Sequence, residues 1–282
     1  STGRIKNILK YLPNIKFVRA DLSQKGKWMK YFKNVDVVFH LAALADIVPS
    51  IENPDLYYKA NVQSTFNVME NCRKFKIKKI IYSASSSCYG IPKKFPTNEV
   101  EKISTEYPYA LTKYLGEKEA LAVNADGFPV VIVNPSAPVG PWDVKPTPTG
   151  RIVLDFQRGR MPAFLDTGLN LVDVRDVAKG HRLAMEHGKP GERYILGNAN
   201  LSLKAILELL AEILNRRPPR IRIPQKLALG LAHANEVISK YITNKQPLIP
   251  LSAVRHAAHY MFYRSDKAIQ ELGFRQTPIQ TA

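Results

Sequence analysis

A tyrosine and a lysine four positions apart are the residues of this sequence best suited to acid–base chemistry. Tyr109 and Lys113 follow Pro108 in a segment with helical periodicity, and their spacing places both side chains on one face of a helix. A nearby ammonium group favours the phenolate and lowers a tyrosine pKa that is ordinarily about 10. We therefore expect Tyr109 to act as a general base that Lys113 activates. The pair alone does not identify an active site, because exposed helices carry the same spacing.

Hydroxyl groups gather upstream of this pair, at the end of a predicted strand. The strand Lys79–Ser83 runs into a serine-rich segment that contains Ser85, Ser86 and Ser87 and closes at Gly90. Ligands of open α/β sheets bind beyond the carboxyl ends of the strands. These serines are therefore placed to hydrogen-bond a substrate oxygen.

Other polar and small residues follow the neighbouring predicted strands. One strand ends at Asp21 and Leu22, the next ends at His40, and Asn61 lies in the helix after it. The residues directly after His40 are small enough to let a flat cofactor approach the backbone, and they are Leu41, Ala42 and Ala43.

Strands and helices alternate along the first half of the chain. Apolar, β-branched runs predict strands covered on both faces at Ile15–Arg19, Val35–His40, Lys79–Ser83 and Val130–Asn134. Helices are predicted between them at Ser23–Phe32, Asp55–Phe75 and Tyr109–Val123. The second half holds a proline-rich loop, Pro141–Gly150, and predicted helices at Arg151–Arg158, Val174–His187, Leu203–Leu214 and Gln225–Ile242. This alternation predicts an α/β protein with a doubly wound, Rossmann-type parallel sheet.

The glycine-rich turn that opens such a sheet does not occur in this sequence. Neither G-x-G-x-x-G nor G-x-x-G-x-x-G is present, although this turn usually follows the first strand and cradles a pyrophosphate. We therefore expect that roughly 35 to 40 further residues, about one βαβ half-unit, precede this stretch of the native chain. The first strand is central in the usual order, so without it two neighbours would lose their ladder partners.

Composition and charge exclude several classes of protein. The 282 residues are 45% hydrophobic with two cysteines and a net charge of +17, which is typical of a globular protein and not of a disordered or disulfide-framework chain. The sequence predicts a cytoplasmic protein with no membrane span or signal peptide. Because the positive charge is spread along the chain and no nucleic-acid motif accompanies it, nucleic-acid binding is disfavoured. The first 127 residues hold 17 Lys and 3 Arg and the remainder 8 and 13, which leaves open whether the halves share one origin.

Three further features are weighed as structural. Cys88 is predicted to be a small buried thiol, because no histidine-centred relay accompanies it. His256 and His259 have no acidic or cysteine partner nearby, so no metal site is expected. Asp173 and Asp176 are interpreted as capping residues at the start of a helix.

Taken in order, the motifs resemble the extended short-chain dehydrogenase/reductase family, the NAD-dependent sugar epimerases and dehydratases. Residues 1–127 are most similar to UDP-sugar 4-epimerases, and residues 128–282 to hopanoid-associated sugar epimerases and dihydroflavonol reductases. The motifs that carry the resemblance are Asp21-Leu22, His40-Leu41-Ala42-Ala43, Asn61-Val62, Ser85 through Tyr89-Gly90, Pro108-Tyr109 with Lys113, and Asn134-Pro135.

The resemblance implies a role for each matching residue. The implied catalytic residues are Tyr109 as acid/base, Lys113, Ser85 and Asn61. The implied cofactor-binding residues are Asp21, Leu22, Leu41, Ala42, Ala43, Ser83 and Pro135, together with Tyr109 and Lys113. The implied substrate-binding residues are Ser85, Ser86, Ser87, Asn134 and Ser136.

The implied reaction is NAD-dependent epimerisation of a nucleotide-linked sugar at C4 through a transient 4-keto intermediate. A dehydratase is disfavoured, because Ser86 and Ser87 stand where dehydratases of the family carry an acidic pair. An NADP-dependent carbonyl reductase and a catalytically silent binding protein remain as alternatives, and NADP in place of NAD is left open. The resemblance also implies a Rossmann-type domain over residues 1–135, a mainly substrate-binding domain over 136–282 with some segments returning to the sheet, and a homodimer formed through the helices Asp55–Phe75 and Tyr109–Val123.

Overall fold

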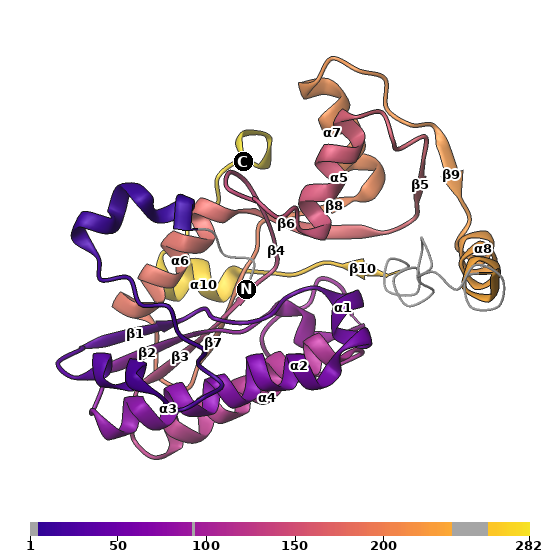
Figure 1. Ribbon diagram of the computed structural model, residues 1–282. Coiled ribbons are helices and arrows are strands. Elements are labelled where there is room, and N and C mark those ends of the chain that lie inside the picture. Colours follow the sequence, from indigo (N-terminus) through magenta and orange to yellow (C-terminus); the bar gives the residue numbers. More distant parts are fainter. Residues whose placement is uncertain (1–4, 92–93, 239–258) are drawn as a thin grey trace.

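The computed structural model describes residues 5–91, 94–238 and 259–282. A parallel four-stranded sheet forms the centre of the larger part of the molecule, with the order β1-β2-β3-β7. Its strands are β1 (Val37–His40), β2 (Lys79–Ser83), β3 (Val130–Pro135) and β7 (Arg193–Leu196). Helices α3 (Ser64–Lys74) and α4 (Pro108–Ala125) cover one face of this sheet, and α6 (Val174–His187) and α10 (Asp266–Leu272) cover the other (Figure 1). The expected Rossmann-type parallel sheet with helices is therefore confirmed.

The central strands are buried on both faces because nearly every residue in them is apolar. Alternate residues of β2 and β3, among them Ile80 and Ile132, pack with α3 and α4. The intervening residues, among them Ile81 and Val133, pack with α6 and α10. This period of two gives each face its own apolar core.

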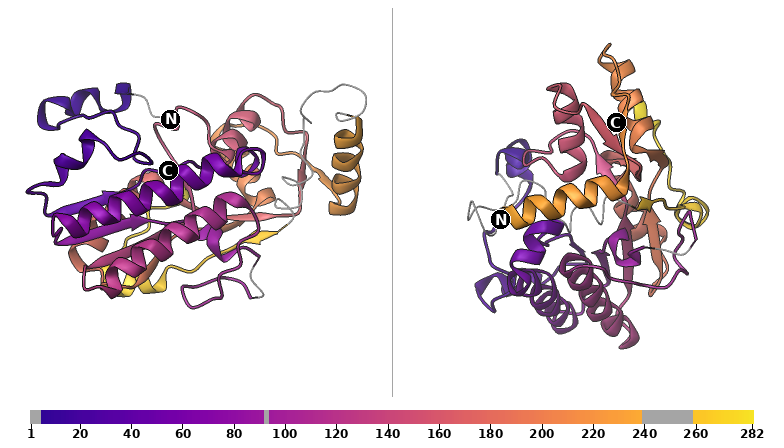
Figure 2. Two further views of the ribbon diagram at one scale, coloured as in Figure 1. Left: turned by 60° about the horizontal axis from the view of Figure 1, so that its bottom comes forward. Right: turned by 90° about the vertical axis from the view of Figure 1, so that its right-hand side faces the viewer.

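The segment predicted as the helix Asp55–Phe75 is helical but not uniform. It consists of α2 (Pro54–Tyr58), a π-helical turn (Lys59–Gln63) and α3, and it is preceded by the short α1 (Ile47–Glu52). Figure 2 shows α3 beside α4 across the face of the sheet. The π turn matters for the site because it holds Asn61.

The second half of the chain builds smaller sheets beside the first one. Strands β4 (Ala137–Val139), β6 (Gly168–Asp173) and β10 (Tyr260–Met261) form a sheet in the order β10-β6-β4, and β8 (Ala199–Ser202) pairs antiparallel with β6. Strands β5 (Ala163–Leu165) and β9 (Ile221–Ile223) form a separate pair. The helices of this part are α5 (Pro148–Gln157), α7 (Leu203–Ile213) and α8 (Gln225–Ile238), and the predicted helix residues 239–242 lie outside the described residues.

Two predictions near the start of the chain are wrong. Ile15–Arg19 is exposed and does not form a strand, and the predicted helix Ser23–Phe32 is only a short 3-10 helix over Lys27–Phe32, after a first 3-10 helix at Ile5–Asn14. The physical reason is pairing: an extended segment becomes a strand only when a neighbour completes its ladder, and β1 is an edge strand with no such neighbour on that side among the described residues. The proline-rich loop also ends earlier than predicted, because Thr147 caps α5 and Pro148 begins it.

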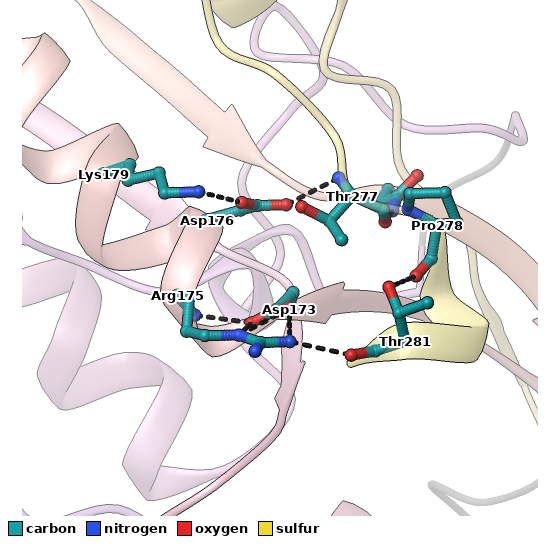
Figure 3. Close-up of polar contacts among 8 residues, drawn as sticks. Asp173, Arg175, Asp176, Lys179, Thr277, Pro278 and Thr281 are labelled. Atoms are coloured by element: carbon teal, nitrogen blue, oxygen red, sulfur yellow. Dashed lines mark hydrogen bonds and ion pairs between the residues drawn. The ribbon is translucent and has the colours of Figure 1, made fainter.

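The chain's last residues are tied to the start of α6 (Figure 3). Asp173 caps this helix by accepting a hydrogen bond from the backbone of Arg175 at 2.7 Å, as predicted. The guanidinium of Arg175 pairs with Asp173 and donates to the carbonyl of Thr281 at 2.8 Å, in a final 3-10 turn (Ile279–Thr281). Asp176 accepts from the backbone of Thr277 at 2.6 Å and from Lys179. Both carboxylates thus hold structure together.

Two absences apply to the described residues alone. Within them, no helix is both long and apolar enough to cross a bilayer. The same ranges contain no group of three His, Cys, Asp or Glu that could hold a metal ion; His256 falls outside them.

Candidate active site

Helix α4 presents the tyrosine–lysine pair from its first two turns. Pro108, which has no N–H, stands at its first position, and the backbone N–H of Tyr109 donates to the Ser50 hydroxyl at 3.1 Å. Gly116 lets the helix approach β2 closely, because a side-chain carbon there would come within 2.4 Å of the Tyr82 hydroxyl. The middle of α4 is therefore packed closely against the end of β2.

The phenol of Tyr109 is hydrogen-bonded to the side chain of Ser85. The rings of Tyr57 and Tyr107 lie with their centres 6.4 Å from that of Tyr109. Burial raises the pKa of Tyr109 above its ordinary value of 10.0. The lowered pKa expected from the helical spacing is thus not found in this structure.

The reason lies in where the Lys113 amine points. Lys113 is only 4% exposed, and its Nζ donates to the carbonyl of Ser83 at 2.6 Å. The same nitrogen lies 4.8 Å from the centre of the Tyr82 ring. Burial lowers the pKa of this amine to about 8. Both side chains therefore lie at the end of β2: Lys113 bonds Ser83, and the phenol of Tyr109 bonds Ser85, two residues further along the chain. The Lys113 amine points to the backbone carbonyl and not to the phenol oxygen.

Asn61 links the loop after β1 to the start of α4. Its Oδ1 accepts from the backbone N–H of Leu44 at 2.7 Å, and its Nδ2 donates to the Leu44 carbonyl and to the Thr112 hydroxyl at 3.0 Å each. Thr112 in turn donates to the carbonyl of Tyr109. A π-helical turn is often found at functional sites, and here it aims Asn61 between two elements. His40 is linked to Asn61 through Thr65, to which it is hydrogen-bonded at 2.9 Å. Burial lowers the pKa of His40 to about 3.

The serine segment turns back on itself in a 3-10 helix, Ser86–Tyr89. The hydroxyls of Ser85 and Ser87 lie 2.8 Å apart, and the backbone N–H of Ser87 donates to Ser85. Ser86 is buried, and its carbonyl accepts from the hydroxyl of Tyr263 at 3.1 Å. Ser87 borders a small hollow whose wall also includes Gly90, Tyr107, Met261 and Tyr263.

Strand β3 brings a third set of polar groups to this place. Asn134 is fully buried, and its Nδ2 donates to the carbonyl of Ser85 at 3.2 Å. Its Oδ1 and the hydroxyl oxygen of Ser136 have no hydrogen-bond partner among the described residues. Pro135, between them, is half-buried. These are open acceptors at the end of the strand beside β2.

The remaining predicted cofactor residues lie in the loop after β1 and in the segment that precedes β1. Leu41, Ala42 and Ala43 follow β1 and are exposed. Asp21 accepts from the backbone and side chain of Ser23, which lowers its pKa, and it lines an open hollow of about 330 Å³. The carbonyl of its neighbour Leu22 accepts from Asn67 of α3 at 2.9 Å.

The structure thus joins Tyr109, Lys113, Ser85, Asn61 and Asn134 by direct contacts or through one intermediate. Sequence reasoning missed three participants: Tyr263, Glu117 and Arg193. Glu117 could have been found, because it lies four positions beyond Lys113 on the same predicted helix face. Tyr263 and Arg193 come from distant segments and gave no local pattern.

A parallel sheet that carries a tyrosine, a lysine and a serine at the carboxyl end of its strands defines an enzyme class, the short-chain dehydrogenases/reductases of the extended kind. A family model described as "NAD dependent epimerase/dehydratase family" matches residues 2–197. The chain belongs to this family, whose cofactor is NAD.

Individual relatives agree on the family and differ in their names. The chain is 38% identical to a putative dihydroflavonol 4-reductase of Synechocystis over 97% of this chain and 81% of that protein. It is 39% identical to a putative UDP-glucose 4-epimerase of Methanocaldococcus jannaschii over 42% of this chain and 38% of that protein. Among solved structures, that of gox2253 matches with a TM-score of 0.84 and 36% identity, covering 100% of this chain and 85% of the other.

Proposed function

We propose that the protein catalyses NAD-dependent epimerisation of a nucleotide-linked sugar at C4. The observation that carries the proposal is that Tyr109 and Lys113 both form a hydrogen bond at the end of β2. The phenol of Tyr109 is bonded to Ser85, and the amine of Lys113 is bonded to Ser83. A hydroxyl oxygen placed beside Ser85 is within reach of the group that can take or return its proton.

Each residue has a separate task in this reaction. Ser85 hydrogen-bonds the sugar 4-oxygen, and Tyr109 exchanges a proton with it. Burial keeps the phenol protonated, which is the form that delivers a proton to a keto oxygen. The hydrogen bond with Ser85 acts in the opposite direction and favours the phenolate needed for the other step. Lys113 is held at the same strand end by its bond to the Ser83 carbonyl. NAD supplies hydride acceptance and donation at C4 when bound.

The residues present fit the two ends of a dinucleotide. At one end, the anionic Asp21 and the small exposed Ala42 and Ala43 leave room for an adenosine group. At the other, the unpartnered Oδ1 of Asn134 is a buried acceptor for an amide N–H. Leu22, Leu41 and Pro135 complete the proposed cofactor contacts. No glycine-rich pyrophosphate turn occurs in the sequence, so these groups account for the ends and not for the centre of the dinucleotide.

The substrate side is formed by the serine segment and the end of β3. Ser85, Ser86, Ser87, Asn134 and Ser136 are the proposed substrate ligands. Elimination of water from a sugar needs an acid and a base beside the active-site hydroxyl. Ser86 and Ser87 offer only neutral hydroxyls in that place, which argues against a dehydratase.

A carbonyl reductase is the second candidate. One relative, matched over 97% of this chain, is named a putative dihydroflavonol 4-reductase, and a protonated phenol is suited to reduction.

One assay separates the two. An epimerase converts UDP-glucose to UDP-galactose with added NAD and no net change in NADH absorbance. A reductase consumes NADPH in proportion to the ketone supplied. Loss of both activities in a folded protein would reject both proposals and favour a silent binding protein.

We further propose that the protein is a homodimer built on α2, α3 and α4, with a cofactor domain over residues 1–135 and a mainly substrate-binding domain over 136–282. Supporting side chains on these helices are large, apolar and exposed: Leu56, Tyr58, Phe66 and Leu111. Light scattering on the purified protein tests the dimer, and a mass of one chain at micromolar concentration would reject it.

A further inference from the structure

A buried carboxylate lies directly behind the proposed proton-transfer site. Glu117 is 0% exposed and follows Lys113 by four positions and Tyr109 by eight on α4. This spacing places all three on one face of the helix, the face that meets the sheet. A buried glutamate is costly unless it is paired, so its partners indicate why it is there.

Two other strands supply those partners. The Nε of Arg193, on β7, donates to one oxygen of Glu117. The Nδ2 of Asn134, on β3, lies 3.4 Å from the other oxygen. Glu117 therefore joins α4 to the two strands that continue the sheet beyond β2.

The carboxylate also determines how the amide of Asn134 is oriented. Nδ2 has two hydrogens, and its two neighbours, the carboxylate of Glu117 and the carbonyl of Ser85, can only accept. An amide turned the other way would place an oxygen against both. Glu117 thus directs Nδ2 toward the Ser85 backbone and leaves Oδ1 as the open acceptor on the opposite side.

The negative charge of Glu117 also raises the pKa of Lys113. The titratable groups around this amine are Tyr82 of β2, His40 of β1, Cys88 of the serine segment and His181 of α6, in addition to Glu117. Burial lowers the pKa of Lys113, while Cys88 and Glu117 raise it. Burial also raises the pKa of the Cys88 thiol to about 12, so the thiol is neutral at pH 7 and the opposing charge comes from Glu117.

We propose that Glu117 is a positioning residue of this site: it orients Asn134 against the backbone of Ser85 and places a negative charge one helical turn from Lys113, with Arg193 as its counter-ion. This role rests on the proposed function in one respect: Ser85 and Lys113 are the residues to which that function assigns the chemistry. The residue itself does not touch the reacting atoms.

The test measures the titration of Lys113 without substrate or cofactor. The protein is labelled with ¹³C at lysine Cε, and the Lys113 signal is assigned by its loss in Lys113→Arg. In the unaltered protein we expect a midpoint at about pH 8. In Glu117→Gln, which keeps the size of the side chain but not its charge, we expect the midpoint to fall by roughly one pH unit.

Asp176→Asn is the matched control. Asp176 is also a buried carboxylate, 1% exposed, but it bonds Thr277 and Lys179 (Figure 3) and lies on α6, which covers the opposite face of the sheet from α4 (Figure 1). A purely structural role for Glu117 would lower the melting temperature in both variants and shift the Lys113 midpoint in neither. An unchanged midpoint in folded Glu117→Gln overturns the proposal.

If Glu117→Gln does not fold, the double variant Glu117→Gln with Arg193→Gln replaces it, because it removes the ion pair together and leaves no unpaired charge. A downward shift is again expected, but a smaller one than in Glu117→Gln, because the loss of the Arg193 positive charge acts in the opposite direction. The readout also separates this role from the reaction: a shifted midpoint in a protein that converts no UDP-sugar sustains the role of Glu117 and rejects the epimerase. An unchanged midpoint in a protein that does convert UDP-sugar rejects the role of Glu117 and sustains the epimerase.

Discussion

Replacing Asn61 by alanine tests whether the π-helical turn holds the site together. Asn61 is 1% exposed and makes three side-chain hydrogen bonds, two to the backbone of Leu44 and one to Thr112. A hydrogen bond contributes about 1 kcal/mol net, and its loss leaves buried partners unsatisfied. We therefore expect Asn61→Ala to lower the free energy of unfolding by about 3 kcal/mol.

Asn71→Ala is the control for this change. Asn71 is equally buried on α3, but its side chain makes one hydrogen bond, within its own helix, to the carbonyl of Asn67. The same reasoning gives a loss of about 1 kcal/mol. Urea unfolding followed by far-ultraviolet circular dichroism measures both variants, and an unchanged m-value confirms that stability alone has changed. Equal losses in the two variants would refute the idea that Asn61 links separate elements.

Three further outcomes are expected. Tyr109→Phe abolishes nearly all turnover in the UDP-glucose assay while the melting temperature stays close to that of the unaltered protein; substantial remaining activity would reject the role of the phenol. His40 has a pKa of about 3 in the folded protein, through burial and then Lys113, against an ordinary value of 6.5. Its contribution to stability is therefore complete above pH 6.5 and is lost as the pH falls toward 3. Unfolding free energies measured across this range fall less steeply in His40→Gln, and parallel slopes would contradict that pKa. Asp176→Ala frees the backbone N–H of Thr277, so hydrogen exchange at Thr277 becomes faster; unchanged protection there would show that the end of the chain is held by other contacts.

Local sequence determined the central layers and most of the residues that meet at the candidate site. The apolar runs at Lys79–Ser83 and Val130–Asn134 predicted buried parallel strands, and these are β2 and β3. The spacing of Tyr109 and Lys113 predicted one helix face, which α4 confirms. Such features are local: periodicity and residue type decide them before any distant contact forms.

Tertiary structure decided what depends on partners. Ile15–Arg19 has the composition of a strand but forms none, because strand formation needs a neighbour to complete the ladder. The direction of the Lys113 amine, toward the carbonyl of Ser83 and away from the phenol, depends on how α4 packs on β2. Arg193 and Tyr263 reach the site from segments far along the chain. The residue types came from the sequence, whereas burial and the pairing of distant segments set the charge and orientation of each group, since both arise only when the elements pack.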